Sequence, residues 1–127
     1  MPNFGHVFGT SLSTIDNAVS VSASTRSDGS NHDAGDPASG PQAQTVVNFI
    51  TISGTSPDVD IYLEESPDNS NWSNGMLIDS ISEAVTDHQL LYVPQARYGR
   101  LSYDNKNVSN SATVTRETFN NHGNYAT

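Results

Sequence analysis

Residues 57–72 read PDVDIYLEESPDNSNW, and this stretch predicts the fold. Val59, Ile61 and Leu63 alternate with polar residues, which is the two-residue period of a β-strand with one buried face. The alternation ends at a cluster of turn-forming residues, and the only tryptophan, Trp72, follows directly. We therefore expect a half-buried strand and a turn, after which Trp72 folds back onto the apolar face.

Six further segments show strand patterns, and turn-forming residues separate them. Together with 58–65 they give about seven strands, and no segment shows a helical period. The sequence therefore predicts an all-β protein with a single antiparallel β-sandwich, either immunoglobulin-like or jelly-roll. A closed barrel also remains open, because the sequence does not identify the edge strands. The further segments are 18–26, 45–53, 76–82, 88–93, 97–104 and 111–119.

The length of 127 residues predicts one domain with a core of its own. We expect residues 1–17 to form an extended N-terminal arm, the sandwich to span 18–119 with a long loop at 27–44, and 120–127 to form a polar C-terminal tail. Core anchors are expected at Val59, Ile61, Leu63, Trp72, Leu101 and Tyr103. The candidate subunit-interface residues are the apolar residues of the arm: Phe4, Val7, Phe8, Leu12 and Ile15.

The composition is strongly acidic, with a net charge of −9 from 14 acidic and five basic residues. Such a balance argues against nucleic acid and against anionic membranes, since both need basic faces. No apolar run reaches the length of a membrane span. Cysteine is absent, and Lys106 is the only lysine. In molar salt the repulsion between carboxylates is screened, so a surface rich in carboxylates and poor in lysine is stable there. The composition therefore favours a halophilic source.

No arrangement of residues indicates catalysis. The four histidines are dispersed through the sequence. Glu64 and Glu65 are adjacent, so in a strand their side chains point to opposite faces and do not form an acid–base pair. Asp58 and Asp60 share a face with Glu64, and we interpret that face as solvated. We expect a protein that is not an enzyme and has no cofactor.

The long loop at 27–44 carries oxygen donors suited to Ca²⁺ or Mg²⁺, namely Asp33 and Asp36, with Asp28 and His32 nearby. Their spacing does not match an EF-hand, so a solvated acidic loop is favoured over a metal site. Asn71 and Asn107 match the N-glycosylation sequon. Asn and Ser are so common in this chain that such matches are expected by chance.

From Thr45 to Phe119 the order of motifs resembles a group of small β-sandwich proteins from tailed viruses. The shared elements are a strand, a turn of Gly and small residues, a Ser-x-Asp-x-x-Asn-Trp turn and an aromatic-x-Arg-Leu-x-Tyr strand. Gly99 departs from this pattern, because a β-branched residue is more usual there, and residues 1–44 carry no resemblance. The matching segments are 45–53, 54–57, 66–72 and 98–103.

The resemblance implies a virion structural protein, with the virion as its location after assembly in the host cytoplasm. The leading expectation is a capsid decoration or cement protein on the particle exterior that stabilises contacts between capsid subunits. The alternative is a tail or fibre component that binds a host-surface glycan through exposed aromatic residues. The expected partners are the major capsid protein or tail proteins, together with further copies of this chain in a homo-oligomer. With the acidic composition, the host would be a halophilic archaeon.

Overall fold

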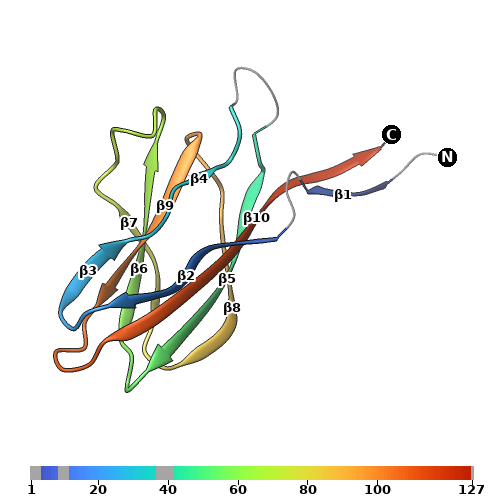
Figure 1. The fold of residues 1–127 in the computed structure, drawn as a ribbon. Helices are drawn as coiled ribbons and strands as arrows, with labels where there is room; N and C mark the ends of the chain where they lie inside the picture. The colour runs from blue at the N-terminus through green and yellow to red at the C-terminus, as the bar shows by residue number, and fades with distance from the viewer. Residues whose placement is uncertain (1–3, 9–11, 37–41, 127) are drawn as a thin grey trace.

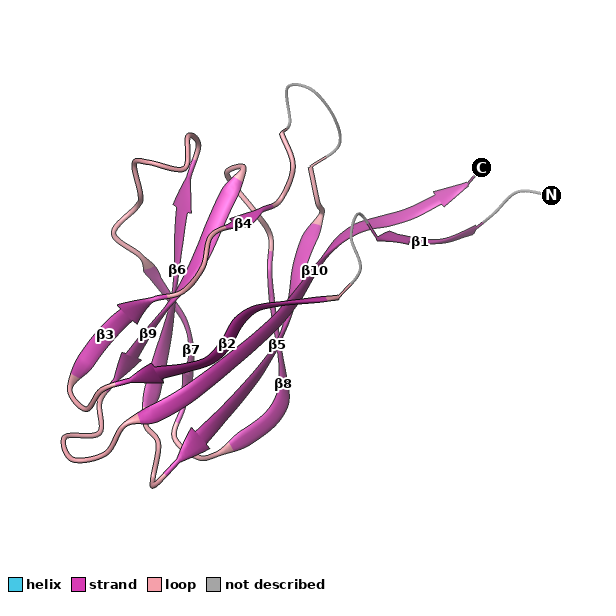
Figure 2. Cartoon of the chain, in the orientation of Figure 1, coloured by secondary structure: helices cyan, strands magenta, loops and turns pink. Residues whose placement is uncertain are grey.

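A computed structural model describes residues 4–8, 12–36 and 42–126. These residues form strands and connecting loops, with no helix among them (Figure 2). The strands are β1 (Phe4–Phe8), β2 (Ser13–Val21), β3 (Thr25–Asp28), β4 (His32–Asp33), β5 (Thr45–Gly54), β6 (Val59–Ser66), β7 (Met76–Ile81), β8 (Val85–Tyr92), β9 (Tyr98–Asn105) and β10 (Ala112–Ala126).

The strands form two antiparallel sheets that pack face to face as a β-sandwich (Figure 1). Sheet A has the order β2-β10-β5-β8, and β1 continues the β2 edge along β10. Sheet B has the order β3-β9-β6-β7, and β4 continues the β3 edge along β9. Between β2 and β10 most connections cross from one sheet to the other. The two exceptions are the β3–β4 connection, which stays on one edge of sheet B, and the β6–β7 hairpin. This connectivity is that of a jelly roll, which selects one of the two predicted sandwiches.

Alternate residues of the strands fill the space between the sheets. On β6 these are Val59, Ile61 and Leu63, which are at most 4% exposed, and on β9 they are Leu101 and Tyr103, which are fully buried. The buried residues of sheet A complete the core: Val21, Val46, Ile50, Ile52, Leu90, Tyr92, Ala112 and Val114. The period-2 pattern of 57–65 therefore places the inward face of β6 as the sequence predicts.

Polar side chains also join the two sheets. The Tyr103 hydroxyl of sheet B donates to Asp16 Oδ2 of sheet A at 2.6 Å. The Asn105 amide donates to the carbonyl of Val21 at 3.1 Å, and at the other edge His88 Nε2 lies 2.7 Å from Asp79 Oδ2. Each of these contacts links one sheet to the other, so the sandwich is held by directional bonds as well as by apolar burial.

Three of the expected segment boundaries are corrected by the strands. The expected arm of 1–17 ends inside β2, which pairs with β10 within the sandwich. The expected tail of 120–127 is, as far as residue 126, the end of β10. The expected loop of 27–44 contains the end of β3 and all of β4, and its residues 37–41 lie outside the described part of the chain. In each case residues with few apolar side chains still form strands, because their backbones pair with a neighbouring strand.

Candidate functional site

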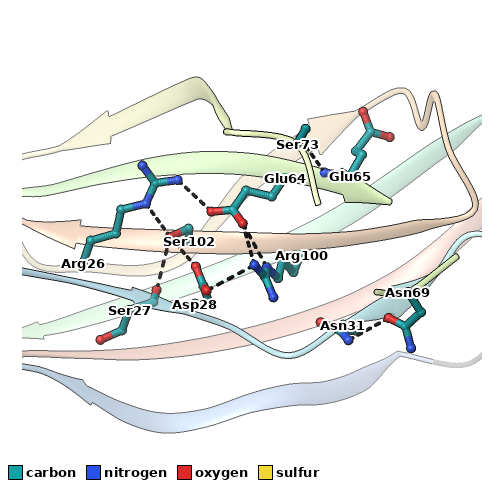
Figure 3. A network of polar contacts seen from close by, with 10 residues as sticks. All are labelled: Arg26, Ser27, Asp28, Asn31, Glu64, Glu65, Asn69, Ser73, Arg100 and Ser102. Carbon is teal, nitrogen blue, oxygen red and sulfur yellow. Dashed lines mark hydrogen bonds and ion pairs between the residues drawn. The ribbon is translucent and has the colours of Figure 1, made fainter. Parts of the chain in front are cut away.

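The outer face of sheet B carries a network of charged and polar side chains (Figure 3). At its centre is Glu64 on β6, which is only 6% exposed. Arg26 on β3 donates from Nη2 to Glu64 Oε2 at 2.7 Å. Arg100 on β9 donates to Glu64 Oε1 from Nη2 at 2.8 Å and from Nε at 3.0 Å. One carboxylate is thus shared by two guanidinium groups, and we call Arg26, Glu64 and Arg100 the arginine network.

Two polar side chains extend the arginine network along the sheet. Asp28 Oδ2 lies 3.2 Å from Arg100 Nη2, which gives that arginine a second carboxylate. The Ser102 hydroxyl, fully buried on β9, accepts from Arg26 Nε at 2.7 Å and donates to Asp28 Oδ1 at 3.0 Å. Side chains from three adjacent strands therefore form one connected set of hydrogen bonds and ion pairs.

Aromatic rings lie against both arginines. The guanidinium carbon of Arg26 is 4.2 Å from the centre of the Tyr62 ring, and that of Arg100 is 4.3 Å from the centre of the Trp72 ring. Both distances are within the range of cation–π attraction. The loop at 67–75 brings Trp72 to this position, and the Ser73 amide anchors the loop on the Glu65 carbonyl at 2.9 Å.

These contacts correct two expectations. Trp72 is not a core anchor: it is partly exposed and lies on the polar face of sheet B, where Arg100 offers a cation for its ring. The acidic face of β6 is not solvated either. Asp60 is 8% exposed, accepts from Ser80 at 2.7 Å and lies 3.4 Å from Lys106, because basic side chains of neighbouring positions cover the carboxylates.

The sequence pattern did not single out the arginines. The available signal was modest: Arg26 and Arg100 are two of only four arginines, and each lies in a segment with a strand pattern. Their meeting at Glu64 depends on the order β3-β9-β6, which is set by the topology of the jelly roll.

The candidate metal ligands of the acidic loop are engaged elsewhere. Arg97 Nη2 donates to Asp33 Oδ2 at 3.0 Å, and this contact lowers the pKa of Asp33. Asp36 lies 3.8 Å from Arg97 Nη1. His32 Nε2 is 2.6 Å from Asn120 Oδ1, and burial lowers the pKa of its imidazole. Among the described residues no cluster of three or more His, Cys, Asp or Glu is arranged to hold a metal ion.

Arg116 on β10 is fully buried in the interior. Its Nε donates to Asn48 Oδ1 at 2.7 Å. Its two Nη atoms and the nearby Tyr92 hydroxyl have no hydrogen-bond partner in the described part of the structure. Burial raises the pKa of the Tyr92 and Tyr103 hydroxyls, and the Arg116 charge opposes that rise. Unpaired buried donors cost stability, so this cluster is the least satisfied part of the core.

Two positions in the segments 66–72 and 98–103 have local explanations. Asp68 organises its turn: Oδ1 accepts the amides of Ser70 at 2.9 Å and Asn71 at 2.8 Å, and these bonds lower the pKa of Asp68. Gly99 lies under the Tyr92 hydroxyl, and a Cβ there would be 2.7 Å from that oxygen. The departure at Gly99 therefore makes room for a tyrosine that crosses from the opposite sheet.

The candidate interface residues of the arm fall on β1 and on the beginning of the sandwich, at Leu12 and in β2. Phe4, Val7 and Phe8 belong to β1, of which the structure describes only the backbone. Leu12 is 50% exposed and lines a shallow depression with Phe49, Asp87 and Glu117, and Ile15 is partly buried on β2. The candidate interface is therefore divided between β1 and the edge of the sandwich.

β1 and the end of β10 form a two-stranded ribbon that projects from the sandwich (Figure 1). The register runs from Phe4 opposite Ala126 to Phe8 opposite Asn121. β5 pairs with β10 only as far as Asn121. Beyond that point the structure pairs residues 124–126 on one side only, with β1. We call this element the ribbon arm.

Comparisons of the chain with protein-family models, with curated proteins and with solved structures found no match. In the part of the chain that the structure describes, no helix has the length and apolar character needed to cross a membrane.

Proposed function

We propose that the protein is a virion structural protein that decorates the exterior of a capsid and stabilises contacts between capsid subunits. The observation that carries the proposal is the ribbon arm. A two-stranded ribbon is marginally stable in water by itself, so an arm that leaves its own sandwich suits docking on another subunit. The sequence resemblance to virion proteins supplies the viral context.

The jelly roll is consistent with this role. Double-sheet jelly rolls recur in viral capsid and lectin domains, which is support by analogy of fold. The remainder of the molecule suits a passive scaffold: directional bonds join the sheets, and the arginine network covers the outer face of sheet B.

Deletion of residues 1–8 tests the proposal. The deletion removes β1 but keeps β2, whose buried Asp16 bonds Tyr103. We expect the shortened protein to fold, with an unchanged circular dichroism spectrum, and to be lost from purified particles by quantitative mass spectrometry. Val108→Asp is the matched control, because Val108 is 80% exposed in the turn before β10, and the ribbon arm is formed by the other end of that strand. Undiminished incorporation of the shortened protein would contradict the proposal.

A second candidate is a tail or fibre component that binds a host-surface glycan, and the partial exposure of Trp72 favours it. Sugars stack on aromatic rings, and Trp72 sits on a folded platform beside Arg100. Because Trp72 is the only tryptophan, its fluorescence reports binding directly. Titration with host-envelope glycans should change that emission, and Trp72→Phe should keep more binding than Trp72→Ala. Absence of binding by equilibrium dialysis would remove this candidate.

A further inference from the structure

The exposed large apolar side chains gather on one flank of the sandwich. β7 ends sheet B and β8 ends sheet A, and the His88–Asp79 contact at 2.7 Å joins these two strands. Six large apolar residues of the described chain are prominently exposed, and four belong to this flank: Met76 at 61%, Leu77 at 51%, Leu91 at 50% and Val93 at 61%. We call these four residues the β7–β8 flank.

The flank is also poor in charge. Residues 76–78 and 89–96 contain no Asp, Glu, Lys or Arg, in a chain whose net charge is −9. The nearby Asp79 carboxylate contacts His88, and Glu65 Oε2 accepts the amide of Gln95 at 2.7 Å. The flank is therefore a surface on which two copies of this acidic chain can approach without strong repulsion.

The backbone of β8 offers a matching edge. Residues His88–Tyr92 pair regularly with β5, whereas the irregularity of this strand lies nearer the turn, at Asp87, whose φ is 50°. In the described residues the outer edge of β8 has no strand beside it. Proteins usually protect such edges with Lys, Pro or bulges, and 88–92 has none of these. The regular, apolar half of β8 is thus an unprotected edge.

We propose that this flank binds a second copy of the chain about a two-fold axis. β8 of one copy pairs antiparallel with β8 of the other, so sheet A continues across the dimer, and the exposed apolar side chains of β7 lie beside the contact. A strand paired with itself satisfies both edges at once, which is what a two-fold contact requires. A standard interface of about 800 Å² per partner is roughly an eighth of the monomer surface of 6678 Å².

Sedimentation equilibrium of the purified protein tests the dimer without any particle. We expect a mass of twice the 13.6 kDa chain, with tighter association in about 3 M than in about 0.1 M NaCl because the acidic surfaces are screened. Leu91→Asp and Val93→Asp should each weaken dimerisation at least about tenfold, since each places a carboxylate in the contact. The matched control, Val108→Asp, should leave the association unchanged.

The same measurement separates this dimer from the proposed role of the ribbon arm. Deletion of residues 1–8 removes the arm and should leave the dimer intact. A monomer at both salt concentrations, a dimer that survives Leu91→Asp and Val93→Asp, or an equal loss with Val108→Asp would each overturn the inference.

Discussion

Replacement of Glu64 by glutamine removes the charge at the centre of the arginine network while keeping its shape. The Glu64 side chain is 8% exposed, and its oxygens lie 2.7 Å from Arg26 and 2.8 Å from Arg100. In the variant the two guanidinium groups face a neutral amide. Arg100 keeps Asp28, whereas Arg26 keeps the Ser102 hydroxyl and the Tyr62 ring.

The expected loss follows from the geometry. Opposite charges about 4 Å apart attract by about 4 kcal/mol at an effective dielectric constant of about 20, and Glu64 makes two such pairs. Much of this attraction is offset, because the arginine side chains are 33% and 20% exposed and recover hydration when the pairs are lost. Breaking a fully buried pair costs about 3–5 kcal/mol. We therefore expect Glu64→Gln to lower the free energy of unfolding by about 2–3 kcal/mol, which is roughly a 10 °C fall in Tm.

Urea unfolding measures this loss, followed by the fluorescence of Trp72 and by circular dichroism to check that the transition is two-state. Arg26→Gln is the matched control, since Glu64 then keeps its contacts with Arg100, and its cost should be about 1 kcal/mol. The double variant gives the coupling energy between the two side chains. A change below about 0.5 kcal/mol for Glu64→Gln would refute the reasoning and place the network among weak surface ion pairs.

Three further outcomes are expected. Gly99→Ala should cost about 1–3 kcal/mol because its Cβ would meet the Tyr92 hydroxyl, and Tyr92→Phe should restore most of that loss in urea unfolding; no restoration would contradict the contact. Burial lowers the pKa of His32, so stability should fall as pH drops below about 6.5, where the unfolded chain takes up the proton first, and His32→Gln should flatten that slope; equal slopes would exclude His32 as the cause. Melting should occur at a higher temperature in about 3 M than in about 0.1 M NaCl, and equal values would remove the halophilic interpretation.

Alternation in the sequence predicts most strands well, because a half-buried strand must place apolar residues on one face. The segments 45–53 and 58–65 match β5 and β6 within one residue at each end, and the inward residues of β6 are those of the pattern. β10 was harder to predict, because its interior positions Arg116, Thr118 and Asn120 are polar although buried. A prediction from hydropathy alone therefore ends this strand at residue 119.

The candidate site was less accessible to sequence reasoning. The sequence predicts Trp72 in the core because the turn before it can fold it back onto the apolar face, but a ring also packs on a guanidinium, and the sequence does not say that Arg100 lies beside it. Likewise, the alternation of β6 places Asp60 and Glu64 on its polar face, but their basic partners are distant in sequence, so the pattern does not show that these partners cover them. Pairing between strands, and not composition, decides which charges meet.

The length of β10 has a mechanical consequence. One continuous strand runs from the core residues Ala112 and Val114 into the ribbon arm. Ten consecutive residue pairs join it to β5, and β2 joins it on the other side. A pull on the arm acts along the strand axis, so it strains both ladders in shear, and many hydrogen bonds share the tension instead of opening one after another. A neighbour that grips the arm therefore pulls on the centre of sheet A rather than on a loose end.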